Sequence, residues 1–338
     1  MARSDLLITL EARLRIEATY RAHPEIEDEQ IVAPLLIVGQ GRSGTSVLQN
    51  LLSADPMNGT VRNWEALFPC PPPETAAYWT DPRIERADRL TTQWNRVVPT
   101  LASMHEFDGR VPVESVHVQC LGFRSPAWFN VFGQVPSYSA YLMQHDSADA
   151  YRYEKRVLKL LQWRNPRRTW VMKSPFALSH LPSVFEVYPD LGVVWPHRDP
   201  VKALASVVSL LGTLHWMRSD APFIGDTLAM FTNADLAAAM MTRPIEWLRN
   251  GEIPADRVHN IQYRDFVRSP LEVVDGIYEN FGIALSETSR SAIRSYMDDN
   301  PRSARRAHAY DLGDQDEILL ERQAFQQYQQ FFGVPDEI

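Results

Sequence analysis

The sequence predicts a three-layer α/β fold in which helices flank a central parallel β-sheet. Three observations predict it: short apolar runs bounded by Pro or Gly, a helical pattern after each run, and cationic side chains where the runs end. Strands that alternate with helices form parallel sheets covered on both faces, and ligands bind beyond the carboxyl ends of the strands. The sequence therefore predicts an anion-binding site at that edge of the sheet.

The N-terminal part of the chain predicts one helix and the first strand–loop–helix unit. Residues 1–30 carry leucines at helical spacing, typical of an amphipathic helix: Leu6, Leu7, Leu10 and Leu14. Residues 34–56 begin with the apolar run 35–38, which is typical of a strand buried on both faces. A glycine-containing loop and a helix that stops at Asp55 complete this unit.

The second and third units have the same order of elements. The apolar run 170–172 leads into Lys173 and a further helical stretch. The run 191–195 leads into Asp199, which suits a helix N-cap, and Pro200, which suits a first helical turn. Both units are predicted to add a strand to the same parallel sheet.

The remaining chain divides into a sheet core, an insertion and a C-terminal segment. The core, residues 169–282, holds a fourth predicted strand at 258–262 and a helix expected from about Pro270. The insertion, residues 64–168, is rich in proline and aromatic residues, and loops of this length in compact domains are usually functional. We predict that it forms a helix-rich lid that binds an acceptor, and that residues 283–338 form helices that close over a cofactor.

The composition is typical of a compact soluble protein, and residues 1–338 are predicted to form one domain. The 338 residues carry 34 Lys and Arg against 42 Asp and Glu, a net charge of −8, which disfavours nucleic acid as a partner. The two cysteines match no metal-ligand spacing, so no metal site is predicted. Neither a signal peptide nor a membrane-spanning stretch is predicted, so a cytoplasmic protein is expected, as a monomer or a homo-oligomer.

The loop between the first strand and its helix, residues 39–46, reads GQGRSGTS. Its outer glycines, Gly39 and Gly44, have the GxxxxG spacing of a phosphate-binding loop. Backbone N–H groups at such a helix N-terminus form an anion cradle. A P-loop NTPase would continue with Lys and Ser or Thr, whereas Thr45 replaces that Lys here and Ser46 remains.

This loop resembles the 5′-phosphosulfate loop of the sulfotransferases that use 3′-phosphoadenosine 5′-phosphosulfate (PAPS), in which Arg-Ser-Gly-Thr-Thr recurs. The resemblance covers about residues 34–310 and implies a P-loop-like fold. It is closest in its motifs to the bacterial and protein-tyrosine branches. It implies that the 5′ end of PAPS is bound by Gly41, Arg42, Ser43, Gly44, Thr45 and Ser46.

A second motif resembles the 3′-phosphate site of the same family. Arg198 follows a strand and Ser206 comes two helical turns after Asp199, so an Arg fork and a hydroxyl can meet on one phosphate. The resemblance further implies that Tyr263 lies near the nucleotide. It also implies a C-terminal basic segment over the nucleotide, for which the candidates are Arg302, Arg305, Arg306 and His308.

The resemblance also implies catalytic residues. Lys173 is one of only four lysines and matches the lysine that stabilises charge near the transferring sulfuryl group; the other three are Lys155, Lys159 and Lys202. Arg42 contributes to the same stabilisation. Glu65 matches the catalytic Glu of the tyrosine-modifying and related bacterial branches, where it is a general base. The cytosolic branch uses a histidine instead, for which the candidates are His105, His117 and His215.

These residues predict a metal-independent enzyme that transfers the sulfuryl group of PAPS to a hydroxyl of a small-molecule or lipid-like acceptor and releases adenosine 3′,5′-bisphosphate (PAP). Because the transition state of such a transfer is expected to be loose, catalysis depends mainly on positioning and charge neutralisation. Two alternatives stay open at this point. One is a P-loop kinase that uses ATP, and the other is a non-catalytic protein that binds a nucleotide or lipid.

Overall fold

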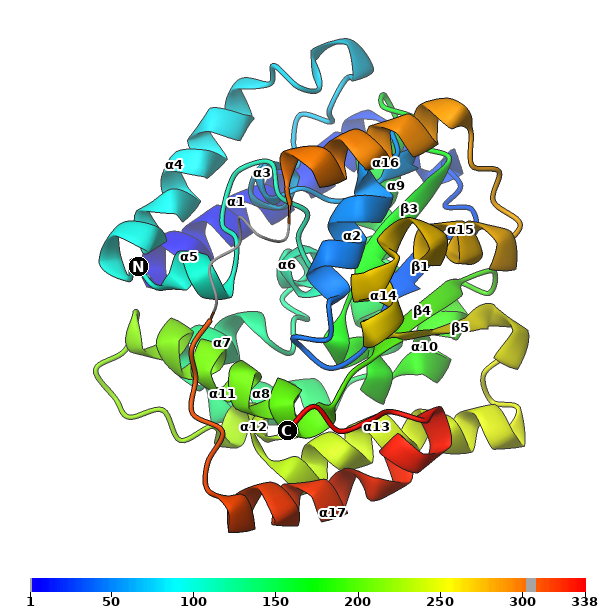
Figure 1. Ribbon diagram of the computed structural model, residues 1–338. Helices are drawn as coiled ribbons and strands as arrows, with labels where there is room; N and C mark the ends of the chain where they lie inside the picture. The colour runs from blue at the N-terminus through cyan, green and yellow to red at the C-terminus, as the bar shows by residue number, and fades with distance from the viewer. Residues whose placement is uncertain (1, 302–307) are drawn as a thin grey trace.

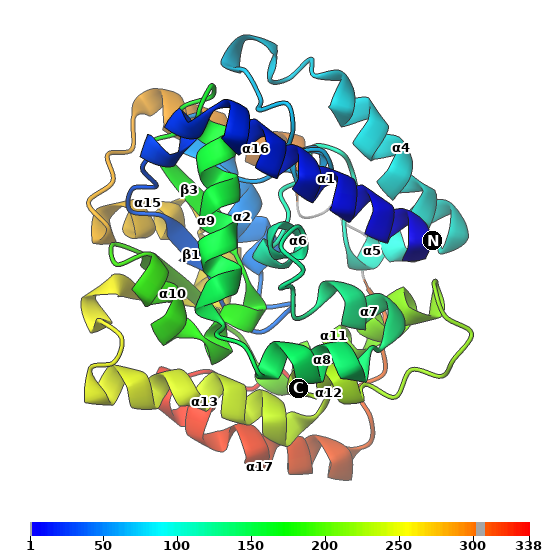
Figure 2. The ribbon, with the colours of Figure 1, turned by 180° about the vertical axis from the view of Figure 1, so that it is seen from behind.

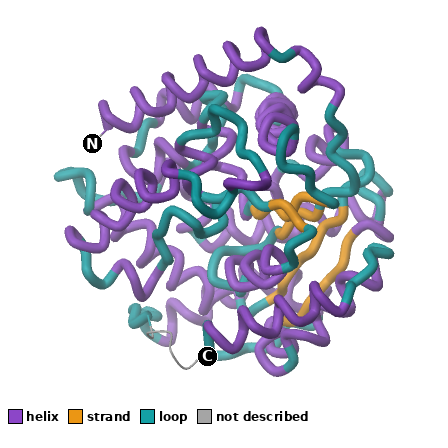
Figure 3. The backbone as a smooth tube through the Cα atoms, turned by 90° about the horizontal axis from the view of Figure 1, so that it is seen from above, coloured by secondary structure: helices purple, strands orange, loops and turns teal. Residues whose placement is uncertain are grey.

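The computed structural model describes residues 2–301 and 308–338. Five parallel strands form one sheet in the order β2-β3-β1-β4-β5, and helices surround it on all sides in Figure 1 and Figure 3. The strands are β1 Leu35–Ile37, β2 Asn58–Gly59, β3 Thr169–Lys173, β4 Gly192–His197 and β5 Val258–Gln262. The predicted three-layer α/β architecture is confirmed.

Alternate residues of each strand point to opposite faces, so the two faces bury different side chains. Leu35 and Ile37 of β1 pack in one core with Val171 of β3, whereas Leu36 and Trp170 belong to the larger core on the other face. The first face is covered by α2 Thr45–Ala54, α14 Tyr263–Arg268, α15 Pro270–Asn280 and α16 Glu287–Asp299 (Figure 1). The burial of both faces explains the continuous apolar runs of the strands.

The second face is covered by helices from both ends of the chain (Figure 2). They are α1 Ala2–Ala22, α9 Ala148–Gln162, α10 Leu181–Val187, α11 Pro200–Trp216, α12 Ala229–Thr232, α13 Ala234–Asn250 and α17 Gln315–Phe332. Asp199 caps α11 by accepting from the Val201 N–H at 3.1 Å, and Pro200 is its first residue, as predicted. This cap fixes where the chain turns from β4 into α11.

The insertion between β2 and β3 is helical over much of its length. Before α9 it contains α3 Asn63–Leu67, α4 Pro82–Val97, α5 Leu101–Met104, α6 Ser115–Cys120, α7 Trp128–Gly133 and α8 Pro136–Met143. Aromatic side chains form two smaller cores, one around Trp64 within the insertion and one around Trp94 that also includes Leu214 of α11. The predicted helix-rich insertion is therefore present, and it packs beside the carboxyl edge of the sheet (Figure 1).

Three details differ from the sequence prediction. The short strand β2 was not predicted, because two residues carry no periodicity. A helix begins at Tyr263, directly after β5, and the helix expected from about Pro270 is a second one. The leucines of α1 face outward, and Leu14 is 70% exposed, because the helix buries the opposite stripe instead: Thr9, Ala12, Ile16 and Tyr20.

Within residues 2–301 and 308–338, no helix is long and apolar enough to cross a membrane. The same residues contain no group of three or more His, Cys, Asp or Glu side chains placed to hold a metal ion.

Candidate active site

The loop between β1 and α2 has the backbone of an anion cradle. Gly39, Arg42 and Gly44 all have left-handed backbone angles, with φ of 124°, 72° and 90°. Gly44 is the N-cap of α2 and provides no side chain to cap it, so the first N–H groups of the helix are left for a ligand. A Cβ on Gly44 would lie 3.2 Å from the Tyr263 ring, closer than an ordinary contact, and the left-handed backbone angle also favours glycine here.

Arg42 extends from this loop and connects it to the second predicted motif. Its Nε donates to the Ser206 Oγ at 2.9 Å, and its Nη1 donates to the Met104 carbonyl at 2.6 Å. Burial lowers the pKa of the Arg42 guanidinium, and the nearby charge of Arg198 lowers it further. No carboxylate pairs with Arg42 within the described residues, so its charge remains available to an anion.

Arg198 lies at the end of β4 and contacts the same loop. Its Nη1 donates to the Arg42 carbonyl at 2.7 Å, and its guanidinium stacks over the Tyr263 ring at 4.3 Å. Its Nε and Nη2 form a two-pronged pair with the Glu337 carboxylate, each at 3.0 Å. The Lys202 ammonium also approaches this carboxylate, at 3.3 Å. The predicted 3′-phosphate motif therefore holds a carboxylate from the C-terminal segment.

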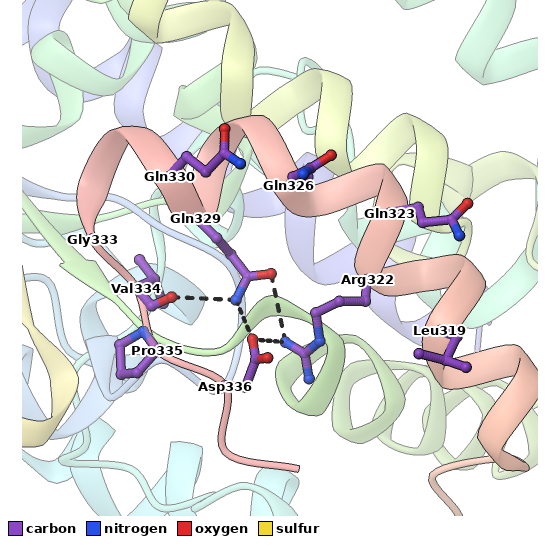
Figure 4. Close-up of a pocket in the computed structure, with 10 residues that line it drawn as sticks. All are labelled: Leu319, Arg322, Gln323, Gln326, Gln329, Gln330, Gly333, Val334, Pro335 and Asp336. Atoms are coloured by element: carbon purple, nitrogen blue, oxygen red, sulfur yellow. Dashed lines mark hydrogen bonds and ion pairs between the residues drawn. The ribbon is translucent and has the colours of Figure 1, made fainter.

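The C-terminal segment that carries Glu337 is fastened to α17, as Figure 4 shows. The Arg322 Nη1 pairs with both Asp336 and the α11 cap Asp199, each at 2.7 Å. Gln329 donates to Asp336 at 2.8 Å. A groove of about 490 Å³ runs between this segment and α17, but its lining contains none of the predicted site residues.

Lys173 is the last residue of β3 and pairs in register with Ile37 of β1. Its Nζ donates to the Ser46 Oγ at 2.8 Å and forms an ion pair with the Glu114 Oε1 at 3.0 Å. The Lys173 side chain is only 3% exposed, whereas that of Glu114 is 23% exposed. The loop lacks the lysine of a P-loop NTPase, and Lys173 of the neighbouring strand β3 thus places an ammonium group beside it.

Glu114, His105 and His117 surround Lys173 from the insertion. Burial alone would raise the pKa of the Glu114 carboxyl, but the charge and hydrogen bond of Lys173 bring it below its ordinary value. Burial lowers the pKa of His117 to about 4. Burial and then the Lys173 charge lower that of His105. At neutral pH the cluster therefore holds an ionised carboxylate beside two neutral imidazoles.

Glu65 lies in a closed environment at the start of α3. Its Oε2 accepts from the Arg62 N–H at 2.8 Å, as part of a capping box, and from the Tyr78 hydroxyl at 3.1 Å. The residue is 1% exposed, and burial raises the pKa of its carboxyl. No hydrogen bond or ion pair joins Glu65 to Lys173 in the described part of the chain. Its role as a base stays a prediction.

The other predicted residues have different surroundings. Ser43 donates to the Gln40 carbonyl at 2.7 Å and so closes the loop. His308 bridges Ser206 and Ser209 of α11, at 3.2 Å from each. His215, at the far end of α11, contacts the Ala221 carbonyl at 3.0 Å rather than the Lys173 cluster. Outside the described residues lie Arg302, Arg305 and Arg306.

Sequence reasoning missed two carboxylates of the site, Glu114 and Glu337. Each meets its cation, Lys173 or Arg198, only through the tertiary fold. Glu114 precedes a helix of six residues and belongs to no motif, so it carried no local signal. Glu337 comes after the last helix, and only its acidic character was visible in the sequence.

A sequence model of the sulfotransferase family matches residues 34–287, which include the loop, Lys173, Arg198 and Tyr263. The chain belongs to the sulfotransferase family. This confirms the resemblance seen in the sequence, and it indicates an enzyme of sulfuryl transfer.

Relatives of this sulfotransferase include mycobacterial proteins, some of which have crystal structures. The omega-hydroxy-beta-dihydromenaquinone-9 sulfotransferase Stf3 of Mycobacterium bovis is 24% identical over 285 residues, which are 80% of this chain and 69% of Stf3. The crystal structure of STF9 from Mycobacterium avium has a TM-score of 0.78 at 26% identity and covers 97% of this chain and 84% of its own. That of STF1 from Mycobacterium tuberculosis has a TM-score of 0.79 at 26% identity, with coverages of 96% and 85%.

Proposed function

We propose that this sulfotransferase transfers the sulfuryl group of PAPS to a hydroxyl of a lipid-like acceptor and releases PAP. One observation carries the nucleotide part of the proposal: the two predicted phosphate motifs, far apart in sequence, meet at Arg42. This residue donates to Ser206, and its carbonyl accepts from Arg198. A nucleotide with phosphates at both its 5′ and 3′ positions matches two anion sites held in one network.

The residues present fit such a nucleotide. The uncapped N-terminus of α2 and the Arg42 guanidinium suit the 5′-phosphosulfate, and Arg198 with Ser206 suits the 3′-phosphate. The ring of Tyr263 lies between Gly44 and Arg198, so it connects the two anion sites. Although the chain has a net charge of −8, this edge of the sheet brings together Arg42, Lys173 and Arg198, and among the described residues Arg42 has no carboxylate partner.

Lys173 distinguishes this site from that of a P-loop kinase. In P-loop NTPases the hydroxyl at the position of Ser46 is a magnesium ligand, whereas here it accepts a hydrogen bond from Lys173. Lys173 and Arg42 can neutralise the charge that develops on the leaving phosphate, which is where a loose transfer needs stabilisation. Each charge-assisted hydrogen bond of this kind contributes about 1.5–3 kcal/mol.

The acceptor is assigned as lipid-like from two observations. The relative Stf3 is named for a hydroxylated dihydromenaquinone, a lipid with a terminal hydroxyl. In this chain Trp94, Trp128 and Phe132 of the insertion form an apolar core with α11, and the Trp128 ring contacts that of His117, beside the Lys173 cluster, at 4.6 Å. An apolar wall next to a charged transfer site suits an acceptor with a long hydrocarbon body and one reactive hydroxyl.

The nucleotide assignment is tested by an Arg198→Ala variant with two ligands, PAP and AMP, which differ by the 3′-phosphate. We expect affinity for PAP to fall at least tenfold, because a charge-assisted pair is lost, while affinity for AMP changes little. Isothermal titration calorimetry measures both. The wild type should also transfer ³⁵S from labelled PAPS to a hydroxylated prenylquinone. Equal losses for PAP and AMP, or no labelled product, would contradict the proposal.

A further inference from the structure

We infer that Glu114 is the general base of this sulfotransferase and receives the proton of the acceptor hydroxyl. The inference rests on the proposed function, because it concerns the same transfer site. Its first support is position: the Glu114 Oε1 lies 3.0 Å from the Lys173 Nζ, which in turn lies 2.8 Å from the Ser46 Oγ at the start of α2. The carboxylate is therefore two contacts away from the cradle for the sulfuryl donor.

The Glu114 carboxylate is also free for this role. Glu114 is the N-cap residue of α6, but its side chain makes no capping hydrogen bond. Lys173 pairs with Oε1, and no hydrogen bond or ion pair within the described residues engages Oε2, which leaves it for a hydroxyl. With 23% of its side chain exposed, Glu114 can be reached by an acceptor that enters from solvent. An ion pair on one oxygen holds the carboxylate in a fixed orientation, as a general base requires.

Glu65, the base that the sequence predicts, has a different environment. Its Oε2 already accepts from the Arg62 N–H and the Tyr78 hydroxyl, and the residue is 1% exposed. Withdrawing its carboxylate toward an acceptor would break a capping box and leave a buried hydroxyl without its partner. The structure thus gives Glu65 a structural role and gives Glu114 the access and orientation of a base.

As the acceptor oxygen forms its bond to sulfur, its O–H bond breaks and the proton passes to the Glu114 Oε2. The bond between sulfur and the bridging phosphate oxygen breaks at the same time, and its electron pair stays on the phosphate of the nucleotide. Lys173, which lies between Glu114 and the donor cradle, stabilises the negative charge of the leaving phosphate.

The pH dependence of the transfer distinguishes the two carboxylates. Glu114 faces Lys173, His105 and His117, and its pKa lies below the ordinary value, whereas burial raises the pKa of Glu65. With Glu114 as the base, kcat/KM should stay constant down to the ordinary glutamate pKa of about 4.3 and fall only below it. An acid limb above that value that disappears in a Glu65→Gln variant would overturn the inference.

The decisive experiment compares Glu114→Gln with Glu65→Gln, using Glu106→Gln as a control at an exposed position of the same insertion. The acceptors are a primary lipid alcohol and a series of substituted phenols of decreasing pKa, with PAPS as the donor. For Glu114→Gln we expect kcat with the alcohol to fall about 10²–10⁴-fold, and the loss to shrink for phenols that are ionised at the assay pH. Affinity for PAP should change less than threefold. A Glu114→Asp variant, which keeps a carboxylate, should recover part of the rate.

Three outcomes would overturn the inference while the proposed function stands. They are full activity of Glu114→Gln, equal loss for every acceptor, which would mean that Glu114 only positions Lys173, and no recovery in a folded Glu114→Asp variant. If the wild-type protein neither binds PAP nor transfers the sulfuryl group, the proposed function fails, and the inference fails with it.

Discussion

Arg42 has a backbone conformation that is unfavourable for a residue with a side chain. Its φ of 72° lies in the left-handed region, which costs a non-glycine residue about 1–2 kcal/mol. Three hydrogen bonds compensate, from its guanidinium to Ser206 and Met104 and from Arg198 to its carbonyl. Strain of this kind is usually found where the surrounding structure fixes a functional group. Here it directs the guanidinium toward Ser206 of the second motif.

Loss of the Lys173 ammonium should slow the transfer step itself. In a Lys173→Met variant the apolar stem is kept but the ammonium is lost, so the leaving phosphate and Glu114 both lose their cation. We expect kcat to fall about 10²–10³-fold, in the range seen when one preorganised donor is removed from a transition state. Steady-state kinetics with labelled PAPS measure the change.

The control for this variant is Lys155→Met, because Lys155 lies on α9 and donates to the Val187 carbonyl, far from the site. It should keep wild-type kcat. A Lys173→Met enzyme with kcat within threefold of wild type would show that the ammonium does not act on the transition state.

At the scale of single residues, sequence motifs predicted which charged and polar side chains lie in the loop and at the strand ends. Arg42, Arg198 and Ser206 could be assigned because each has a fixed offset from a strand or a cap, and the structure brings them together. Glu114 and Glu337 could not, since their partners depend on how distant elements pack. Contacts between residues that are distant in the sequence produce no periodic pattern in a single sequence.

Among the elements, α1 shows why a pattern can indicate a helix but not its orientation. Its leucines have helical spacing, yet Ile16 and Tyr20 are the residues that face the core. Tyr20 is fixed there by a hydrogen bond from its hydroxyl to the Arg156 carbonyl at 2.7 Å. The helix therefore has two apolar stripes, and the stripe that contains the aromatic side chain of Tyr20 is the one that packs against the core.

The C-terminal segment is expected to compete with the 3′-phosphate of the nucleotide for Arg198. The Glu337 carboxylate holds both prongs of the Arg198 guanidinium, which is the group proposed to bind the 3′-phosphate. Removing its charge in a Glu337→Gln variant should therefore tighten PAP binding by up to about fivefold, since a partly exposed ion pair contributes about 0.2–1 kcal/mol. Affinity for AMP should not change. Calorimetric titration with both ligands measures the difference.

The matched control is Glu246→Gln, which removes one charge from an exposed position of α13. If Glu246→Gln tightens PAP binding as much as Glu337→Gln does, the effect reflects overall charge and not competition at Arg198.

For the whole molecule, Asp55 joins elements that are distant in sequence. Its fully buried carboxylate accepts from Arg168 at 2.6 Å, from Tyr278 and Ser289 at 2.8 Å each, and from the Met57 N–H at 2.9 Å. These contacts connect the end of α2 to α15, α16 and the chain entering β3. An Asp55→Asn variant should lower the free energy of unfolding by about 3–5 kcal/mol, measured by urea denaturation, because it leaves a buried network incomplete.

The pH dependence of stability gives a second readout for Asp55. Burial alone would raise the pKa of its carboxyl, but the hydrogen bonds of Met57, Ser289, Tyr278 and Arg168 bring it below the ordinary value. Because the folded pKa is depressed, the stabilisation is present above the unfolded pKa of about 3.9 and is lost as pH falls through the folded value. The Asp55→Asn protein should lack this loss.

The control for Asp55→Asn is Asp275→Asn, which removes a pair with Arg290 that also connects α15 to α16. Both side chains of that pair are about 30% exposed, so the expected cost is at most about 1 kcal/mol. Equal destabilisation by the two variants would mean that the burial of Asp55 is not what matters.

The architecture of the whole molecule was predictable because each strand–loop–helix unit carries its own signal. The four longer strands and the covered sheet follow from runs such as 35–38 and 191–195, whose residues are apolar on both faces. The path of the insertion could not be predicted, because its short helices, such as α5 and α7, are held by aromatic contacts around Trp94 and not by local propensity.

The position of β1 in the middle of the sheet has a consequence for how the site opens. β1 is hydrogen-bonded on both edges, to β3 and to β4, so its amides can exchange with solvent only when the sheet itself separates. The C-terminal segment is held mainly by side chains and can detach alone. Hydrogen exchange should therefore be slow at the base of the 5′ half of the proposed nucleotide site and fast beside its proposed 3′ half. The 5′ end of the nucleotide would lie beside the strand whose amides exchange most slowly. The 3′ end would lie beside a segment whose amides exchange while the rest of the protein stays folded.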